Sequence, residues 1–364
     1  MNDIAHMRAA LTLARRGLGN AWPNPAVGCV IVKDGRVVGR GWTQPGGRPH
    51  AETEALSRAG AAAQGAAAYV TLEPCSHHGR TPPCAEALIA AGMARVVTAI
   101  KDSDPRVSGR GLALLRAAGI AVETGLCADA ASELNAGFFL RVAEGRPLVT
   151  LKLATSLDGR IATAGGESRW ITGAAARGRA HLLRATHDAV LVGTGTALAD
   201  DPELTCRLPG LENRSPVRIV IDRQLRLPTT LRLVAGAQVT PTWVATQAAA
   251  DPARRAALAA QGVKIIAGEP DAVGGVDLAA LLQDLGSEGL TRLLVEGGGR
   301  LAASLLRAGL VDRLVWMHAP LAIGGDGVPA IATLGLDKLA GAPRFTLAAV
   351  ETAGGDVIET YRRA

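Results

Sequence analysis

Apolar positions in the first 145 residues alternate between the period of a strand and that of a helix. Two apolar runs, 27–33 and 36–40, flank Asp34-Gly35, a pair typical of the turn of a β-hairpin. Further strands are expected at 67–72, 95–100 and 120–123. Helices are expected at the N-terminus, from about His50, from about Cys84, at 111–118 and at 130–141. The pattern therefore predicts an α/β domain.

A second α/β series follows a break at Gly145 and Pro147, two residues that end helices. Strands are expected at 148–154, 189–192, 218–221, 242–245, 263–266, 293–295 and 314–317. Helices are expected near 174–184, 251–260, 277–286 and 300–307. Strands separated by helices predict a largely parallel sheet covered on both faces, whose ligands bind beyond the carboxyl ends of the strands. We expect two domains, 1–145 and 146–364.

Composition narrows the classes of protein. Hydrophobic residues make up 48% of the chain, enough for a core in each half. No apolar run reaches the roughly 18 residues that a membrane span needs, and the N-terminal segment lacks the pattern of a signal peptide. The five cysteines, an odd number without an export signal, argue against a disulfide framework. We therefore expect a cytoplasmic protein with no membrane partner.

The charge of the chain favours an anionic ligand, because its formal net charge is +6 and its pI is about 9.4. Aromatic residues, on which single-stranded nucleic acids stack, make up only 3%, and lysines and arginines form no cluster. A small phosphorylated ligand is therefore expected, and no nucleic-acid partner.

Four residues of the first half carry the clearest chemistry. Zinc bound by one histidine and two thiolates keeps a fourth position for water and lowers the pKa of that water towards 7. His50, Cys75 and Cys84 are the expected ligands of one Zn²⁺ per chain, and Glu52 is the expected catalytic carrier of the proton to a leaving amine. Residues two apart do not share a face within a helix, so His50 and Glu52 must lie at a helix N-terminus.

A structural zinc site is the alternative to this interpretation. It requires a fourth protein ligand, which His77 or His78 would supply, and it leaves Glu52 without a function. The remaining cysteines, Cys29, Cys127 and Cys206, are interpreted as packing residues.

The spacing of the four residues resembles a known superfamily. H-x-E followed by P-C and a second cysteine is the signature of cytidine-deaminase-like proteins. Eight residues separate Cys75 from Cys84 instead of the usual two. This longer segment, with PNPAVGCVIV at 23–32, resembles the deaminase half of bifunctional riboflavin-biosynthesis deaminase/reductases. The resemblance implies a three-layer cytidine-deaminase-like domain in which Asn24 binds the substrate. The flanking prolines, Pro23 and Pro25, give the alternative that Asn24 only holds a turn.

Three loops of the second half follow expected strands and combine glycine with hydroxyl, acidic and basic residues. They are contained in 149–172, 193–207 and 295–306. Backbone amides of Gly297–Gly299 and the N-terminus of the next helix suit a phosphate. The spacing G-x-G-x-x-G is absent, so no Rossmann site is expected. Together the loops resemble the reductase half of the same family, whose fold is similar to dihydrofolate reductase.

The resemblance implies NADPH as cofactor and a phosphorylated pyrimidine ribosylamine as substrate. Implied contacts with NADPH are Ala154, Trp170, Thr196, Asp200, Gly297, Gly298 and Gly299. Implied contacts with the substrate are Ser168, Arg184, Leu204, Arg207 and Glu296. The forked guanidinium groups of Arg184 and Arg207 suit a phosphate, and Glu296 suits ribose hydroxyls or proton transfer.

Several positions in the second half keep alternative interpretations. Trp170 either packs on the nicotinamide or buries a helix end, and the alternative for one of Asp200 and Asp201 is a cap of the turn before Pro202. Lys152 is a further candidate contact. Three arginines are candidates for the extra phosphate of NADPH: Arg160, Arg169 and Arg223.

The expected function is bifunctional. The resemblance implies deamination of a 2,5-diamino-6-ribosylamino-pyrimidinone 5′-phosphate, followed by reduction of its ribosyl group to ribityl with NADPH. A homo-oligomer is also expected. One alternative is a deaminase of RNA or a nucleobase with a C-terminal binding module. Another is a non-catalytic zinc protein whose second domain senses a nucleotide.

Overall fold

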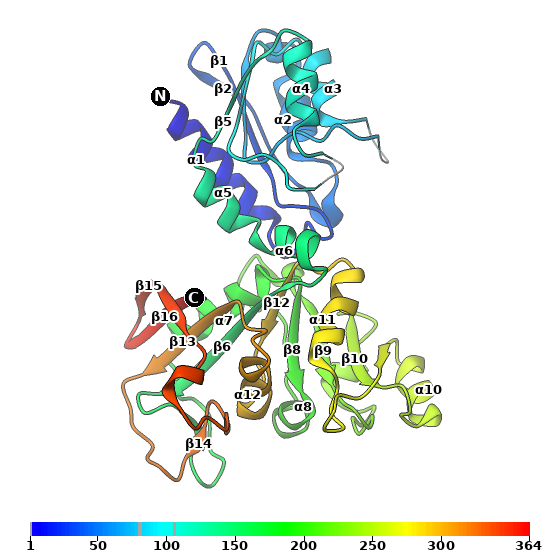
Figure 1. The fold of residues 1–364 in the computed structure, drawn as a ribbon, viewed down its shortest axis with the longest axis vertical. Coiled ribbons are helices and arrows are strands. Elements are labelled where there is room, and N and C mark those ends of the chain that lie inside the picture. Colours follow the sequence, from blue (N-terminus) through cyan, green and yellow to red (C-terminus); the bar gives the residue numbers. More distant parts are fainter. Residues whose placement is uncertain (1, 79–81, 105–106) are drawn as a thin grey trace. The chain divides into compact units, whose positions relative to one another are not determined.

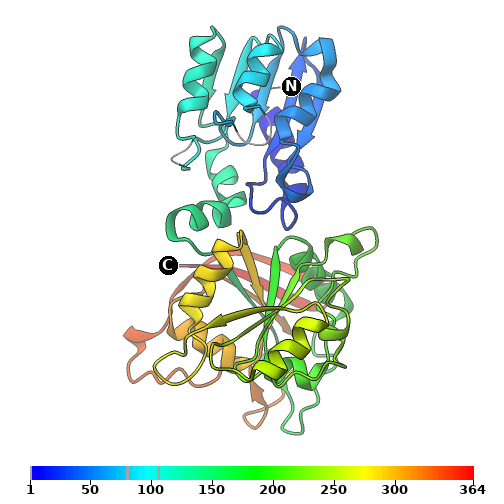
Figure 2. The same ribbon diagram turned by 90° about the vertical axis from the view of Figure 1, so that its right-hand side faces the viewer.

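The computed structural model describes residues 2–78, 82–104 and 107–364, and the chain divides into two compact units, Met1–Gly145 and Arg146–Ala364. Figures 1 and 2 show a sheet with flanking helices in each unit. Among the described residues, no helix is long and apolar enough to cross a membrane.

The first unit has three layers around a five-stranded sheet of order β2-β1-β3-β4-β5. Its strands are β1 (Gly28–Lys33), β2 (Arg36–Trp42), β3 (Ala67–Val70), β4 (Arg95–Thr98) and β5 (Ala121–Thr124). Its helices are α1 (Asp3–Ala14), α2 (Ala51–Ala59), α3 (Cys84–Ala90), α4 (Arg110–Ala117), α5 (Ala128–Leu134) and α6 (Ala136–Glu144). β1 is antiparallel to β2 and β3, whereas β3, β4 and β5 are parallel.

Alternate residues of β1 enter two different cores, because side chains along a strand point to opposite faces. Cys29 and Ile31 pack with residues of α2, α3 and α4, whereas Val30 and Val32 pack with residues of α1 and α5. The expected three-layer fold is confirmed, and Cys29 is a packing residue.

One predicted helix of the first unit was wrong. The expected helix at 130–141 is divided into α5 and α6 at Asn135, whose φ of −100° and ψ of 14° are not helical. The buried side-chain amide of Asn135 accepts from Ala26 N at 2.9 Å and donates to Ala26 O at 3.1 Å. This pairing with a distant segment leaves no trace in the apolar period.

The second unit is built on a nine-stranded sheet of order β11-β10-β9-β8-β12-β6-β13-β16-β15, and β7 pairs with β14 separately. Its strands are β6 (Leu148–Ser156), β7 (Arg160–Ala162), β8 (Ala189–Gly193), β9 (Val217–Ile221), β10 (Thr242–Gln247), β11 (Lys264–Gly268), β12 (Arg292–Val295), β13 (Arg313–Ala319), β14 (Val328–Pro329), β15 (Phe345–Ala353) and β16 (Asp356–Arg363). Its helices are α7 (Ala174–Ala185), α8 (Thr194–Asp200), α9 (Arg232–Ala235), α10 (Pro252–Ala260), α11 (Leu278–Ser287) and α12 (Gly299–Arg307).

The sheet is parallel from β11 to β13, as expected, and antiparallel where β16 pairs with β13 and β15. The α/β fold is therefore confirmed, but the hairpin β15–β16 was not predicted. β15 is an edge strand, and all its residues from 346 to 352 are exposed. Burial therefore imposes no alternating pattern on its sequence.

Parallel pairing brings the carboxyl ends of three strands to one edge of this sheet. Val295 lies opposite Leu151 of β6 and Leu191 of β8. Beyond these positions, β6 continues with Lys152 and Ala154, and β8 leads into α8. The loop that begins at Glu296 leads from β12 into α12. This edge is where a doubly covered sheet binds its ligands.

A buried histidine predicts an acid sensitivity of the second unit. The Nδ1 atom of His187 lies 2.7 Å from Leu183 O and its Nε2 atom lies 2.9 Å from Thr150 Oγ1, so a neutral ring satisfies both partners. Burial, and then the positive charge of Arg292, lower the pKa of His187 to about 3.

Because the neutral form of His187 is favoured in the folded state, its stabilisation is present above pH 6.5 and declines as the pH falls towards 3. We expect a loss of about 1.4 kcal/mol in the free energy of unfolding for each pH unit in this window. Calorimetry should show that the free energy of unfolding of the second unit depends less on pH in His187→Asn. The unfolding transition of this unit is identified as the one that added NADPH shifts. Identical pH dependence in both proteins would contradict the assignment.

Candidate active sites

Two helix N-termini and one loop bring together a histidine and two cysteines in the first unit. His50 is the N-cap of α2, Cys84 is the first residue of α3, and Cys75 lies in the loop after β3. His50 Nδ1 lies 3.3 Å from Cys84 Sγ and 3.6 Å from Cys75 Sγ, and the three atoms lie within 4.8 Å of one another. Ligands of a tetrahedral zinc ion, with bonds of about 2.0 and 2.3 Å, lie about 3.5 Å apart. The three side chains therefore fit zinc.

The start of α3 holds the two sulfur atoms in place. Cys84 N donates to Cys75 Sγ at 3.3 Å, and Ala85 N donates to Cys75 O at 3.1 Å. The Cys84 thiol donates to the Cys75 sulfur, which lowers the pKa of Cys75 to about 4 and raises that of Cys84. The shared proton thus favours the thiolate at Cys75, and a dication between the sulfurs would favour the second thiolate.

Glu52 lies in the first turn of α2 and is only 3% exposed. Burial raises the pKa of Glu52 to about 7, against the opposing attraction of His50 and with repulsion from Cys75 adding to the rise. A carboxyl group with this pKa exchanges its proton near neutral pH, as a general acid and base must.

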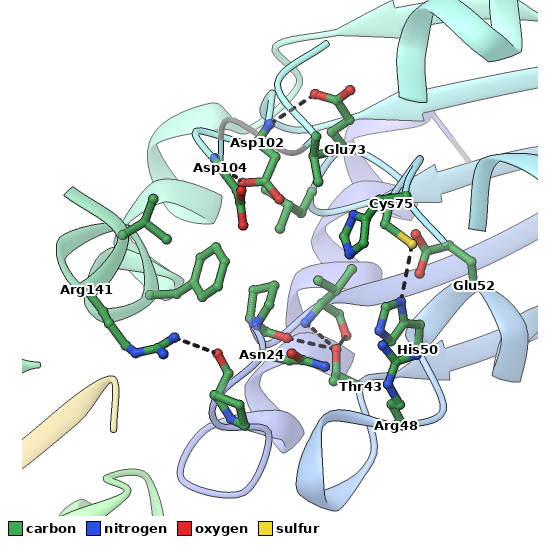
Figure 3. A pocket seen from close by; sticks show the side chains of 18 residues that line it. Asn24, Thr43, Arg48, His50, Glu52, Glu73, Cys75, Asp102, Asp104 and Arg141 are labelled. Atoms are coloured by element: carbon green, nitrogen blue, oxygen red, sulfur yellow. Dashed lines mark hydrogen bonds between the residues drawn. The ribbon is translucent and has the colours of Figure 1, made fainter. Parts of the chain in front are cut away.

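The group of three candidate ligands, His50, Cys75 and Cys84, is called the metal cluster below. It opens into a cavity of about 290 Å³ (Figure 3). The expected residues that line it are Asn24, His50, Glu52 and Cys75; Cys84 lies behind them, 1% exposed. Asn24 Nδ2 donates to Gly47 O at 2.9 Å, and the same residue faces the cavity, so both interpretations of Asn24 remain.

The structure gives the cluster no fourth protein ligand among the described residues. His77 lines the cavity, whereas His78 is exposed and pairs with Glu86 at 3.4 Å. The donor set is therefore that of a zinc site with an open position, next to a buried carboxyl group.

Sequence reasoning missed several polar residues of this cavity: Arg48, Glu73, Asp102, Asp104 and Arg141. Figure 3 shows Asp102 and Asp104 across the cavity from His50. Both follow β4, so acidic residues beyond the carboxyl end of a predicted strand were the available signal.

Replacing Cys75 with serine should release the metal, because a hydroxyl group is a much poorer zinc ligand than a thiolate. We expect the zinc content to fall well below one per chain and deamination to fall on the order of 100-fold or more. Elemental analysis and ammonia release provide the measurements. Cys127→Ser is the control, since Cys127 lies at the start of α5 and outside the cluster. Full zinc content in Cys75→Ser would exclude this residue as a ligand.

The second unit has a cavity of about 420 Å³ at the edge where its strands end. It is lined by seven of the expected residues: Ala154, Ser168, Trp170, Arg184, Asp200, Leu204 and Arg207. Lys152 also lines it. These side chains come from β6, α7, the last residue of α8 and the loops that follow β7 and α8, so these seven expected contacts with cofactor and substrate share one space.

Glu296 does not line the cavity but pairs with two residues that do. It accepts from Arg184 Nε at 2.6 Å and Nη2 at 3.0 Å, and Lys152 Nζ lies 3.8 Å from its carboxylate. Burial alone would raise the pKa of Glu296, but attraction to Arg184 and Lys152 exceeds this effect and lowers it to about 2. Arg184 and Lys152 thus share one buried carboxylate at the cavity wall, and burial lowers the pKa of Lys152.

The glycine loop after β12 and Thr196 lie outside this cavity. They lie next to each other, because a Cβ atom on Gly298 would be 3.6 Å from Thr196 Oγ1. A Cβ atom on Gly299 would approach Pro329 O to 2.6 Å, so this position requires glycine. The loop and Thr196 thus form a second group beside α12 and α8.

The three arginines considered for the extra phosphate of NADPH differ in their positions relative to the cavity. Arg169 lines the cavity, Arg160 Nε donates to Gly324 O at 3.0 Å, and Arg223 Nη1 donates to Gly274 O at 3.0 Å. Sequence reasoning missed Arg177, whose guanidinium group lies 4.6 Å from the ring centre of Trp170 and which also lines the cavity. Trp170 is 67% exposed, so it does not bury a helix end.

Comparison with known proteins matches both units. Residues 1–100 match the family described as the cytidine and deoxycytidylate deaminase zinc-binding region, and residues 147–358 match the RibD C-terminal domain. The riboflavin biosynthesis protein RibD of Escherichia coli is 47% identical over 98% of both chains. That of Bacillus amyloliquefaciens is 42% identical over 97% of this chain and 94% of its own.

Solved structures agree along the whole chain. RibD of Acinetobacter baumannii is 40% identical and superposes with a TM-score of 0.89, covering 100% of this chain and 99% of its own. A diaminohydroxyphosphoribosylaminopyrimidine deaminase/5-amino-6-(5-phosphoribosylamino)uracil reductase of Thermotoga maritima is 34% identical, with a TM-score of 0.86 and coverage of 99% and 98%.

Proposed function

The chain belongs to the RibD family of bifunctional deaminase/reductases of riboflavin biosynthesis, and from this premise we propose the reaction and the residues of each unit. The family membership makes the protein a zinc-dependent aminohydrolase and an NADPH-dependent oxidoreductase in one chain. The substrate is a 2,5-diamino-6-ribosylamino-pyrimidinone 5′-phosphate. The first unit replaces its 2-amine with oxygen, and the second reduces the ribosyl group to ribityl.

In the first unit His50, Cys75 and Cys84 hold the zinc ion, which lowers the pKa of a water molecule that it binds. Glu52 accepts a proton and delivers it to the departing amine, which leaves as ammonia. The observation that carries this role is the buried carboxyl group of Glu52 in the turn that begins at His50, with a pKa raised to about 7. Asn24 orients the pyrimidine from the cavity wall.

In the second unit NADPH supplies the hydride, and the chain's residues position the reactants. Contacts with NADPH are made by Ala154, Trp170, Thr196, Asp200 and Gly297–Gly299, and contacts with the substrate by Ser168, Arg184, Leu204, Arg207 and Glu296. The guanidinium groups of Arg184 and Arg207, which both line this cavity, support binding of a phosphorylated substrate. Location in the cytoplasm and assembly into a homo-oligomer belong to the proposal.

Incubation with the diamino-pyrimidine ribosylamine phosphate, followed by mass spectrometry, tests both steps. Without NADPH we expect exchange of one amine for oxygen, with release of ammonia. With NADPH the product should gain two further hydrogens. Affinity for tRNA at moderate salt, with neither product formed, would instead support an RNA deaminase. Full-length similarity to RibD proteins does not favour that alternative.

A further inference from the structure

A buried glutamate with no catalytic task lies beside the metal cluster. Glu73 is 3% exposed and is separated from Cys75 by a single residue, Pro74. No lysine, arginine or histidine among the described residues forms an ion pair or hydrogen bond with Glu73 in the structure. A buried carboxylate without a cation needs other donors, since burial without them is costly.

Backbone amides supply these donors. Glu73 Oε2 accepts from Asp102 N at 3.2 Å and from Gly109 N at 2.8 Å. Glu73 Oε1 accepts from Gly111 N at 3.0 Å and from Leu112 N at 3.4 Å. One carboxylate therefore joins the beginning of the segment between β4 and α4 to its end (Figure 3 shows the bond to Asp102).

The far end of this segment depends on Glu73 for its cap. α4 begins after Gly109, which has a φ of +87° and no side chain to accept from the free amides of the first turn. Glu73 accepts from the amides of this turn and places a negative charge at the positive end of the helix.

The packing around Gly111 makes the connection close. A Cβ atom on Gly111 would lie 2.0 Å from Pro74 O, so the start of α4 contacts the backbone between Glu73 and Cys75 directly. The metal ligand Cys75 and the contacts that hold the segment between β4 and α4 therefore belong to one short stretch, residues 73–75.

The segment forms part of the wall of the deaminase cavity. Asp102, Asp104 and Val107 all line that cavity, and Asp104 N donates to Asp102 Oδ1 at 2.9 Å. Carboxylates on this wall are acceptors for the N–H groups that an aminopyrimidine presents.

We infer that Glu73 is a positioning residue of the deaminase, which fixes the distance between the metal cluster and the wall that carries Asp102 and Asp104. The inference rests on the proposed deaminase function. Glu73 also borders the cavity, but both of its carboxylate oxygens accept from backbone amides, so it acts through these amides and not through contact with the substrate. Loss of the carboxylate should therefore weaken substrate binding without releasing zinc.

Glu73→Gln tests this in the full-length, zinc-loaded chain, because the amide turns an NH₂ group towards N–H donors. We expect KM for deamination to rise at least about tenfold, with a smaller change in kcat. Amides at 109–112 should exchange hydrogen at least about tenfold faster, while those of β3 keep their rates. Zinc content and reductase kinetics should be those of the wild type.

Two further variants provide a second test and a control. Gly111→Ala disturbs the same contact from the other side and should reproduce the rise in KM. Glu123→Gln removes an exposed carboxylate that pairs with Arg95 at 2.7 Å and should change nothing.

Unchanged KM and exchange rates in Glu73→Gln would overturn the inference. Loss of zinc with faster exchange throughout the sheet would also overturn it, since Glu73 would then only hold the unit together. If the wild type fails to deaminate the substrate, the proposed function fails. Exchange at 109–112 with retained zinc still tests the positioning of the segment by Glu73.

Discussion

Replacing Glu52 with glutamine is expected to slow deamination by about 10²–10⁴-fold while zinc stays bound. Glutamine has the shape of glutamate but does not take up or deliver a proton at neutral pH. The three side chains that fit zinc are His50, Cys75 and Cys84, so the metal does not depend on Glu52. Because burial already disfavours the charged form of Glu52, the neutral amide should not destabilise the unit.

Ammonia release and elemental analysis of the same preparation give the measurement. Reduction of added deaminated product by NADPH should be unchanged, which shows that the chain is folded and its concentration correct. Glu54→Gln is the matched control, since Glu54 is on the same helix and pairs with Arg58 at 3.0 Å. Full turnover by a zinc-bound Glu52→Gln protein would exclude Glu52 as the proton carrier.

The metal cluster was predictable because its geometry is encoded locally. His50 and Glu52 lie at the start of one helical pattern, Cys84 lies at the start of another, and Cys75 follows a strand, so each residue lies at the end of an element that the apolar period reveals. The chemistry of the donors then restricts the ion. Only the question of a fourth protein ligand, for which His77 and His78 were the candidates, needed the three-dimensional structure.

Glu73 was not predictable, because its hydrogen-bond partners among the described residues are backbone amides. Amides exist at almost every position, so the sequence carries no pattern for them. Asp102 and Asp104, by contrast, follow a predicted strand and were recognisable as candidates. The contacts that define a cavity wall are thus less visible in a sequence than the residues that bind a metal.

The pair Arg184–Glu296 was also hidden, since the two residues lie 112 positions apart. Each was recognised as a candidate contact, but nothing in the sequence showed that the guanidinium group binds the carboxylate. Arg184 Nη1 additionally donates to Thr205 O at 3.0 Å. Arg184 therefore offers a phosphate only part of its fork, whereas Arg207 is 52% exposed and pairs with Glu203 at 2.6 Å.

This difference predicts unequal effects on the reductase. Arg207→Ala removes an exposed ion pair of little value to the fold. It should raise KM for the phosphorylated substrate about 10- to 100-fold, the equivalent of a charge-assisted hydrogen bond of about 1.5–3 kcal/mol. Wild type and variant should be compared on the substrate with and without its phosphate, and the preference for the phosphate should nearly vanish in Arg207→Ala. Unchanged kinetics, or equal loss on both substrates, would contradict the phosphate contact.

Arg184→Ala should have the larger effect, because it removes the closest cation of the buried Glu296 carboxylate and leaves it the weaker pair with Lys152, at 3.8 Å. Breaking a buried pair on one side costs about 3–5 kcal/mol, so both the melting temperature and the reductase rate should fall. The double variant Arg184→Ala/Glu296→Gln removes the unpaired charge. It should recover much of the stability in calorimetry but not the activity in NADPH oxidation, because both proposed substrate contacts are then missing. Recovery of activity together with stability would show that the pair only supports the fold.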